Sequence, residues 1–409
     1  MPADRSLRRF ALVTFVDSTG TSMYLTVAVV FFVKVLGLHA RFVGLGLTVG
    51  AAAGLSASLP AGRLADRVGP HRVISACYLA EAALFAWLPF IHGEVEFVVV
   101  VTGIALAANG AGPAKRVLLS HLAGESSRVA ASAYNRAVLN VGMGLGAAIA
   151  GGALAAGSHF AYDLLLIGNA ASFVIAIAIV RTLPKPPVRI AQSNGEALGP
   201  PRSRHPLIQR RLVAAAFTCG TLYLSASVLD VGLALQVTDK TTVPHWMIAA
   251  LLLTNTVLAV ALQVRTSRGS ESISGAATAN RRAGIALLAA CALFALSGHR
   301  PTALAALLLL AALLALTAGE LLSSAGSWGL SYGMAPADRQ GEYLASFGLI
   351  SQGVQVAGPA LAALVVSTGT TAWLTLGITF LVAGLATPLI TASARSSDTG
   401  QTFVSAERS

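Results

Sequence analysis

Long apolar runs alternate with short polar segments along almost the whole chain. The run at 42–62 contains no charged residue, and the run at 73–92 contains only Glu81. A hydrocarbon core of ~30 Å needs about 20 helical residues, so runs of this length predict membrane-spanning helices. The pattern therefore predicts an all-α integral membrane protein with twelve spans: 10–36, 42–62, 73–92, 97–115, 132–156, 162–182, 212–237, 245–264, 283–298, 302–325, 344–367 and 372–393.

One segment interrupts the series of spans. Residues 183–211 are rich in proline and carry glycine, serine and scattered charge, which is typical of a flexible connection. We expect an N-terminal six-helix bundle at 1–182, a cytoplasmic linker at 183–211, and a C-terminal six-helix bundle with a short cytoplasmic tail at 212–409.

Composition and charge agree with a membrane protein. The chain is 55% hydrophobic and 11% charged, against about 25% charged in ordinary soluble domains. Of 28 lysines and arginines, 24 fall on one predicted side; the exceptions are Lys34, Arg41, Lys240 and Arg300. This asymmetry predicts a multi-pass plasma-membrane protein with both termini in the cytoplasm. The net charge of +11 then reflects topology and indicates no nucleic-acid partner.

The clearest motif joins the second and third predicted spans. It consists of Gly62, Leu64, Asp66, Arg67, Gly69 and Arg72. Glycine permits close helix approach and tight turns, and an aspartate is favourable near a helix N-terminus. The pattern resembles the loop 2–3 signature of the major facilitator superfamily, with Pro70 and His71 as departures.

The resemblance implies two six-helix bundles in which helices 1, 4, 7 and 10 line a central cavity, and a secondary transporter similar to drug/proton antiporters. Asn109 lies on the fourth of these spans. The stretch from Gly103 to Pro113 contains no basic residue, where exporters of the family carry an arginine.

Other motifs give no support for an enzyme. Gly142–Ala147 imitates a dinucleotide fingerprint without a preceding strand, and Gly329–Gly333 imitates a hydrolase nucleophile turn without a histidine and acid partner. The histidines lack metal-ligand spacing, and the three cysteines form no Cys-x-x-Cys pair. We expect no catalysis, cofactor, metal or disulfide.

Acidic residues inside apolar spans are the candidate functional groups, because burying a carboxylate in a bilayer is costly. Asp17, Asp230 and Glu320 fall on expected cavity helices and are the candidates for proton coupling; Glu81 falls on a helix that is usually peripheral. Polar residues at helical spacing extend the expected substrate cavity: Thr21, Tyr24, Tyr223, Ser227 and Ser324.

The expected cavity carries acids, while the basic residues lie near span ends. Such a cavity disfavours anions and suits protons with cationic or neutral amphipathic molecules. We expect proton-coupled export of small hydrophobic or cationic compounds by a monomer in the lipid bilayer. One alternative is proton-coupled uptake of a neutral solute, and another is a non-transporting receptor or scaffold.

Overall fold

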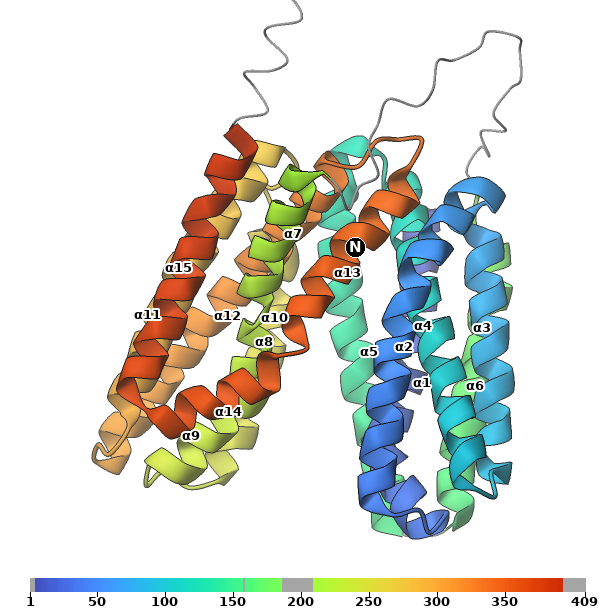
Figure 1. Cartoon of the computed structure of the whole chain (residues 1–409), viewed down its shortest axis with the longest axis horizontal. Coiled ribbons are helices and arrows are strands. Elements are labelled where there is room, and N and C mark those ends of the chain that lie inside the picture. Colours follow the sequence, from blue (N-terminus) through green and yellow to red (C-terminus); the bar gives the residue numbers. More distant parts are fainter. Residues whose placement is uncertain (1–3, 157–158, 186–208, 393–409) are drawn as a thin grey trace, which may run out of the picture. The chain divides into compact units, whose positions relative to one another are not determined.

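The computed structural model describes residues 4–156, 159–185 and 209–392 (Figure 1). Most of the predicted linker 183–211 and all but the start of the C-terminal tail lie outside the described residues. Backbone contacts divide the chain into two compact units. Unit 1 is Met1–Pro200 with Ala335–Leu349, and unit 2 is Pro201–Met334 with Ile350–Ser409. The assignment of 335–349 to unit 1 was not predicted.

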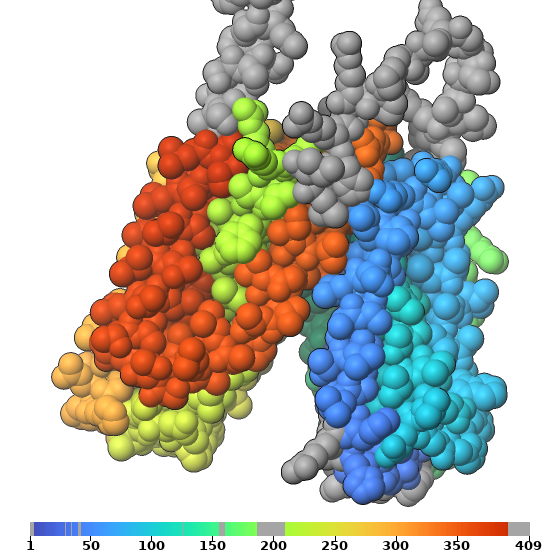
Figure 2. All heavy atoms as spheres, viewed as in Figure 1, coloured from blue at the N-terminus to red at the C-terminus, as the bar shows by residue number. Residues whose placement is uncertain are grey.

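Unit 1 is built from six long helices and the first part of a seventh. The elements are α1 (Arg5–Val30), the π-helix η1 (Phe31–Val35), α2 (Ala40–Val68), α3 (Pro70–Trp87), the 3₁₀ turn η2 (Leu88–Phe90), α4 (Glu94–Ala123), the 3₁₀ turn η3 (Glu125–Ser127), α5 (Arg128–Ala156), α6 (His159–Arg181) and α13 (Gln340–Gln355) up to Leu349. Helix α2 packs along α4, and in Figure 2 their blue and cyan atoms lie side by side.

Small residues let α1 pack closely against α5 and α6. A Cβ atom at Gly142 or Gly146 of α5 would collide with α1, and one at Gly20 of α1 would collide with Asn169 and Ser172 of α6. The hydroxyl of Ser22 also donates to the backbone carbonyl of Met143 at 2.7 Å. Close packing of this kind is a common use of glycine in membrane helices, and here it fixes the position of α1.

Unit 2 contains the remaining helices. They are α7 (Arg210–Tyr223), α8 (Ser225–Ser227), the π-helix η5 (Val228–Gly232), α9 (Leu233–Lys240), α10 (Trp246–Thr266), α11 (Ile273–Ser297), α12 (Thr302–Gly333), α14 (Gly358–Thr368) and α15 (Thr370–Ala392), with the last part of α13. Helix α11 packs between α12 and α15, and α15 also contacts α7. Figure 2 shows α15 in red beside the green atoms of α7.

The predicted spans are close to the helices that form, and three of the differences have a visible cause or consequence. The spans 212–237 and 344–367 are each interrupted: a π-helix follows α8, and α13 ends at Gln355 before α14 begins at Gly358. Pro359 in the first turn of α14 explains the second break, because proline lacks an N–H group for the preceding helix. Helix α11 begins at Ile273, ten residues before the predicted start. The prediction excluded Arg281 and Arg282 from the apolar span, whereas both are exposed residues within the helix.

The count of membrane-length helices is also close to the prediction. Among the described residues, eleven helices are long and apolar enough to cross a membrane. The helix at the predicted first span, α1, is not among them. No strand occurs in the described part of the chain, which confirms the all-α fold class.

Candidate functional site

A cavity of about 310 Å³ lies within unit 1, between α1, α3, α4 and α5. Its wall combines charged, hydroxyl, aromatic and aliphatic side chains. The polar and aromatic lining residues are Asp17, Ser18, Thr21, Tyr24, Glu81, Phe85 and Lys115. Asp17, Thr21 and Tyr24 therefore lie together, at the helical spacing by which the sequence analysis grouped them.

Asp17 is the centre of a polar cluster in this wall. Its Oδ2 atom accepts a hydrogen bond from the Lys115 ammonium at 2.8 Å and another from the Tyr78 hydroxyl at 3.0 Å. The ammonium also lies 5.5 Å from the centre of the Tyr78 ring. The Asp17 and Lys115 side chains retain 14% and 29% exposure, so water reaches both only in part. A charged pair with an added hydroxyl donor satisfies most of what a partly buried carboxylate requires.

Lys115 was not predicted to take part in the site. The sequence analysis placed it at the end of the span 97–115 and counted it with the cytoplasmic charges. Helix α4 instead continues to Ala123, so Lys115 lies two helical turns before its end. The sequence did contain a signal for this pair, since Asp17 and Lys115 are an acid and a base on separate apolar spans. Each is costly to bury alone and is stabilised by the other.

Glu81 is the second carboxyl of the cavity. It lies on α3, is 5% exposed, and its Oε2 atom is buried without a hydrogen-bond partner among the described residues. Asp17 and Lys115 are near enough to interact with it electrostatically. The sequence analysis left Glu81 out of the coupling candidates because its helix is usually peripheral in the family.

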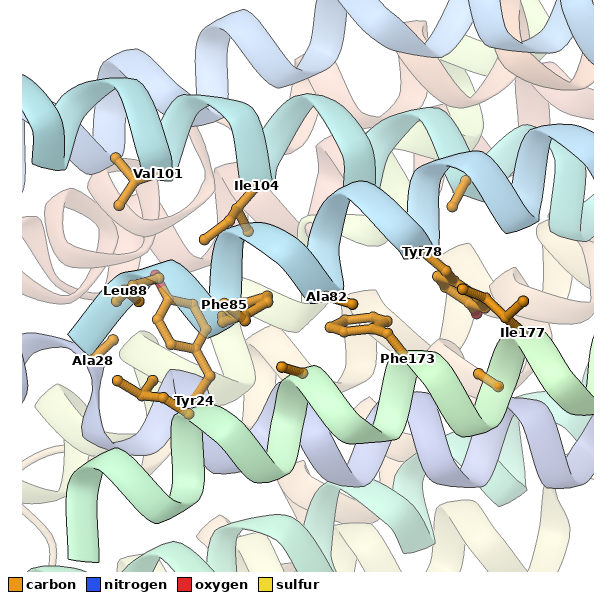
Figure 3. Close-up of a cluster of buried hydrophobic side chains, with 14 of the residues drawn as sticks. Tyr24, Ala28, Tyr78, Ala82, Phe85, Leu88, Val101, Ile104, Phe173 and Ile177 are labelled. Atoms are coloured by element: carbon orange, nitrogen blue, oxygen red, sulfur yellow. The ribbon is translucent and has the colours of Figure 1, made fainter. Parts of the chain in front are cut away.

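Aromatic rings form the apolar side of the cavity and continue behind it. Tyr24 meets Phe85 edge to face at a centroid distance of 4.8 Å, Phe85 stacks on Phe173 at 5.7 Å, and Phe173 lies 5.4 Å from Tyr78 (Figure 3). Tyr78 and Phe173 are almost completely buried, so they are part of the core of unit 1.

The other predicted cavity residues of unit 1 and unit 2 lie elsewhere. Asn109 donates to the carbonyl of Ala105 on its own helix, facing α2 near Gly54. In unit 2, Tyr223 ends α7, Ser227 ends α8 and packs on Gly358, and Asp230 lies exposed in η5.

Glu320 and Ser324 lie on α12 of unit 2. Glu320 is partly buried and Ser324 is buried. The hydroxyl of Ser323 donates to the backbone carbonyl of Glu320. The three carboxyls predicted for coupling thus belong to different units, with Asp17 in unit 1 and the other two in unit 2.

The signature between the second and third spans is mostly helical, whereas a loop was expected. Helix α2 extends to Val68, Gly69 alone makes the turn with φ +92°, and Pro70 begins α3. Gly69 thus adopts the left-handed conformation that favours glycine. Leu64, Arg67 and Arg72 are exposed on this end of unit 1.

The remaining signature residues contact the segment 335–349 within unit 1. Oxygens of Asp66 accept hydrogen bonds from the backbone N–H groups of Gly341 at 2.7 Å and Glu342 at 3.0 Å, at the start of α13. A Cβ atom at Gly62 would collide with the carbonyl of Gly341. An acidic side chain at a helix N-terminus satisfies N–H groups that lack intrahelical partners.

A second set of contacts holds the same segment. Glu342 accepts from Arg63 at 3.0 Å and from Arg339 at 2.6 Å, and its side chain is 7% exposed. Ser120 of α4 donates to the side chain of Gln340 at 2.7 Å in a buried position. These contacts explain why residues 335–349 belong to unit 1, and Arg63 and Glu342 were not singled out from the sequence.

Solved structures with the same fold include transporters of different substrates. The human organic anion transporter MFSD10 (TETRAN) matches with a TM-score of 0.68 and 16% identity, covering 95% of this chain and 100% of that one. A bacterial homologue of the iron transporter ferroportin, in the outward-facing state, matches with a TM-score of 0.71 and 15% identity over 95% and 98% of the two chains. The proton:xylose symporter XylE matches with a TM-score of 0.68 and 13% identity over 93% and 94%.

The sequence has no significant match among curated proteins. Identities of this size with solved structures establish the fold alone. The family model described as "Major Facilitator Superfamily" matches residues 10–359, which is most of the chain. Together with the all-helical fold and the eleven membrane-length helices, this match shows that the protein is a multi-pass membrane protein that belongs to the Major Facilitator Superfamily.

Proposed function

We propose that this protein exports small hydrophobic or cationic compounds in exchange for protons, by alternating access. Its family supports secondary transport of a small molecule. The cavity of unit 1 carries the finer proposal, because its described lining combines two carboxyls, Asp17 and Glu81, with the rings of Tyr24 and Phe85. Aromatic and carboxylate groups together favour cationic amphipathic ligands.

The ion pair that Lys115 forms with Asp17 argues against an anionic substrate in this cavity. A fixed cation is what carboxylate and phosphate ligands require. Lys115 supplies that charge in the described wall, but its ammonium already pairs with Asp17 at 2.8 Å. An anion would have to displace Asp17, whereas a cation or an uncharged molecule can enter without breaking the pair.

Proton coupling follows from the presence of carboxyls in a membrane-spanning domain. A carboxyl that is exposed to each side in turn can bind a proton on one side and release it on the other. Exchange of one proton for an uncharged compound moves one charge, which is worth about 2.3 kcal/mol per 100 mV and supports a roughly fifty-fold substrate gradient. Exchange of one proton for one monovalent cation moves no net charge, so the pH difference alone drives it, with about a tenfold gradient per pH unit. The proposed carriers include Asp17 in unit 1, and Asp230 and Glu320 in unit 2.

A second candidate is proton-coupled uptake of a neutral solute. The hydroxyls of Ser18, Thr21 and Tyr24 in the cavity wall favour it, since they can donate to and accept from an uncharged polar ligand. A non-transporting receptor or scaffold is the third reading. In each case we propose a monomer without catalytic activity, in the plasma membrane, with both termini in the cytoplasm.

Transport into proteoliposomes tests the proposal. The purified protein is reconstituted, and uptake of ethidium, a fluorescent monocation, is followed with an acidic lumen, an alkaline lumen, or no gradient. Exchange for protons predicts uptake only with the acidic lumen, and its loss when nigericin collapses the gradient. Protein-free vesicles measure passive entry.

The outcome separates the three functions. Uptake of a neutral solute from a compound panel, driven by acid outside the vesicles, would favour the symporter. Ethidium entry that is equal under all gradients and equal to that of protein-free vesicles would contradict export, and the same result across the panel would favour the receptor or scaffold.

A further inference from the structure

Glu81 differs from Asp17 in having a buried carboxyl oxygen without a partner among the described residues. It is a carboxyl with 5% exposure that also lines the cavity of unit 1. Its Oε2 atom is buried, and no described residue forms a hydrogen bond with it. Buried polar atoms in folded proteins nearly always have a partner, so this oxygen indicates a bound proton, while the rest of the carboxyl side chain is available at the cavity wall.

The groups around Glu81 make its carboxyl the one whose ionisation changes the net charge of the cavity wall. The titratable groups that face it are Asp17 on α1, Lys115 on α4, and Cys77 and Tyr78 on its own helix. Asp17 and Lys115 neutralise each other in their 2.8 Å contact, and the Tyr78 hydroxyl donates to Asp17. When Glu81 is ionised, the cluster therefore has a net charge of −1, and one bound proton or one monovalent cation neutralises it.

The side chains near Glu81 indicate what kind of cation fits. Phe85 lies one helical turn beyond Glu81 on the same face of α3, and Tyr24 packs edge to face against Phe85. Ile104 and Met143 add aliphatic surface to the same wall. The volume of about 310 Å³ is near the lower end for small-molecule pockets. The combination fits a small monovalent cation with an aromatic or aliphatic body.

We propose that Glu81 binds the positively charged group of the ligand and that a proton competes with the ligand for the same carboxyl. The Asp17–Lys115 pair stays formed and serves as the fixed, neutral part of the wall. The inference rests on the proposed function for its ligand class. It adds Glu81 to the proposed carriers. Within the cavity of unit 1 it gives the exchange of proton and ligand to Glu81 in place of Asp17, which stays paired with Lys115.

Equilibrium binding to the purified full-length protein tests this without transport. Binding of ethidium is measured by calorimetry at acidic and alkaline pH, in two buffers of different ionisation enthalpy so that released protons are counted. We expect weaker binding at acidic pH and release of protons on binding where Glu81 is protonated. Nile red, an uncharged hydrophobic dye, should bind with no proton release.

Substitutions assign the effect to Glu81. Glu81→Gln should lower ethidium affinity about tenfold and abolish the proton release, while Nile red binding is retained. Glu81→Asp keeps a carboxyl and should retain proton release with reduced affinity. Glu94→Gln removes an exposed carboxyl at the start of α4 and should behave as the unmodified protein.

The results separate this inference from the transport proposal. Proton release that persists in Glu81→Gln, or ethidium binding by the unmodified protein that does not depend on pH, would overturn the role of Glu81 even if proton-driven export is observed. If Glu81→Gln does not fold, as judged by gel filtration, Glu81→Asp and the unmodified protein decide the question. Proton-linked binding that depends on Glu81 would support the inference even if no gradient drives transport.

Discussion

At the scale of single residues, the contact between Asp17 and Lys115 determines how charge is distributed in the cavity of unit 1. The two charges come from α1 and α4 and share the hydroxyl of Tyr78. Placing one charge in an apolar helix bundle is costly, and placing two opposite charges in contact reduces that cost. The pair therefore allows a polar cavity wall without a net charge of its own.

Removal of one partner should show this dependence. Lys115→Met leaves Asp17 partly buried with only the Tyr78 hydroxyl as its described partner, and we expect a loss of about 1–3 kcal/mol in the free energy of unfolding. Thermal unfolding in detergent measures it. The double variant Asp17→Asn/Lys115→Met should recover most of the loss, because neither charge remains. A double variant whose loss equals the sum of the two single losses would show that the pair does not couple energetically.

The sequence indicated one member of this pair and missed the other for a physical reason. Asp17 was identified because an acid inside an apolar run is costly without a partner. Lys115 lies beside Arg116 at the end of an apolar run, a pattern that is equally typical of a cytoplasmic helix end. The hydrogen bond from Tyr78, and the unpartnered oxygen of Glu81, depend on the packing of α3 against other helices. Composition and spacing carry no information on such contacts.

At the scale of elements, the end of α2 is a docking point for the start of α13 within unit 1. Asp66 accepts from two backbone N–H groups of α13, and Gly62 leaves room for the carbonyl of Gly341. Glu342 adds ion pairs with Arg63 and Arg339. The motif was recognised from residue types and spacing, but its partner lies some 275 residues away and was not identified.

Loss of the Asp66 carboxylate should weaken this docking. Asp66→Asn keeps one oxygen acceptor but loses the negative charge at the helix N-terminus, so we expect the docked state to lose about 1–3 kcal/mol. Hydrogen exchange at the amides of 341 and 342 should accelerate, and transport should slow while expression stays normal. Arg67→Gln, at an exposed position on the same helix, is the matched control. Unchanged exchange and turnover in Asp66→Asn would show that the contact does not hold α13.

Element boundaries were predictable where composition changes sharply and not where the backbone changes within an apolar run. The start of α3 follows a glycine with positive φ and a proline, both visible in the sequence. The π-helix η5 lies within the predicted span 212–237, and its residues, Asp230 and Gly232 included, do not distinguish it from an α-helix. Hydropathy also excluded the charged first turns of α11. The N-cap of this helix is nevertheless favourable, because the Ser272 hydroxyl accepts a hydrogen bond from the backbone N–H of Gly275.

At the scale of the whole molecule, the sorting of basic residues leads to a definite topology. Of 28 lysines and arginines, 24 fall on the side predicted to be cytoplasmic. Eleven described helices are membrane-length. Both termini lie in the cytoplasm only if α1 also crosses, which gives an even number of spans. Because α1 carries Asp17 in its middle, its crossing is the one that we test.

Cysteine accessibility tests the topology directly. In a variant with Cys77, Cys219 and Cys291 replaced by alanine, single cysteines are introduced as His39→Cys, Glu94→Cys, Gly195→Cys and Asp239→Cys. If the side with most basic residues is cytoplasmic, an impermeant maleimide should label positions 39, 94 and 239 in intact cells. It should label position 195 only after permeabilisation. The three natural cysteines are buried or partly buried, so their replacement by a smaller apolar residue is a suitable background.

Each position tests a different part of the argument. Position 39 lies between η1 and α2, so its labelling from outside, together with a cytoplasmic N-terminus detected by an epitope tag, requires α1 to cross the membrane. Position 94 is the first residue of α4 and position 239 lies one residue before the end of α9, so they report the predicted outer ends of the two halves of the chain. Labelling of position 195 from outside intact cells would contradict the cytoplasmic linker. It would also contradict the assignment of 24 basic residues to the cytoplasmic side, because seven of them lie between 181 and 211.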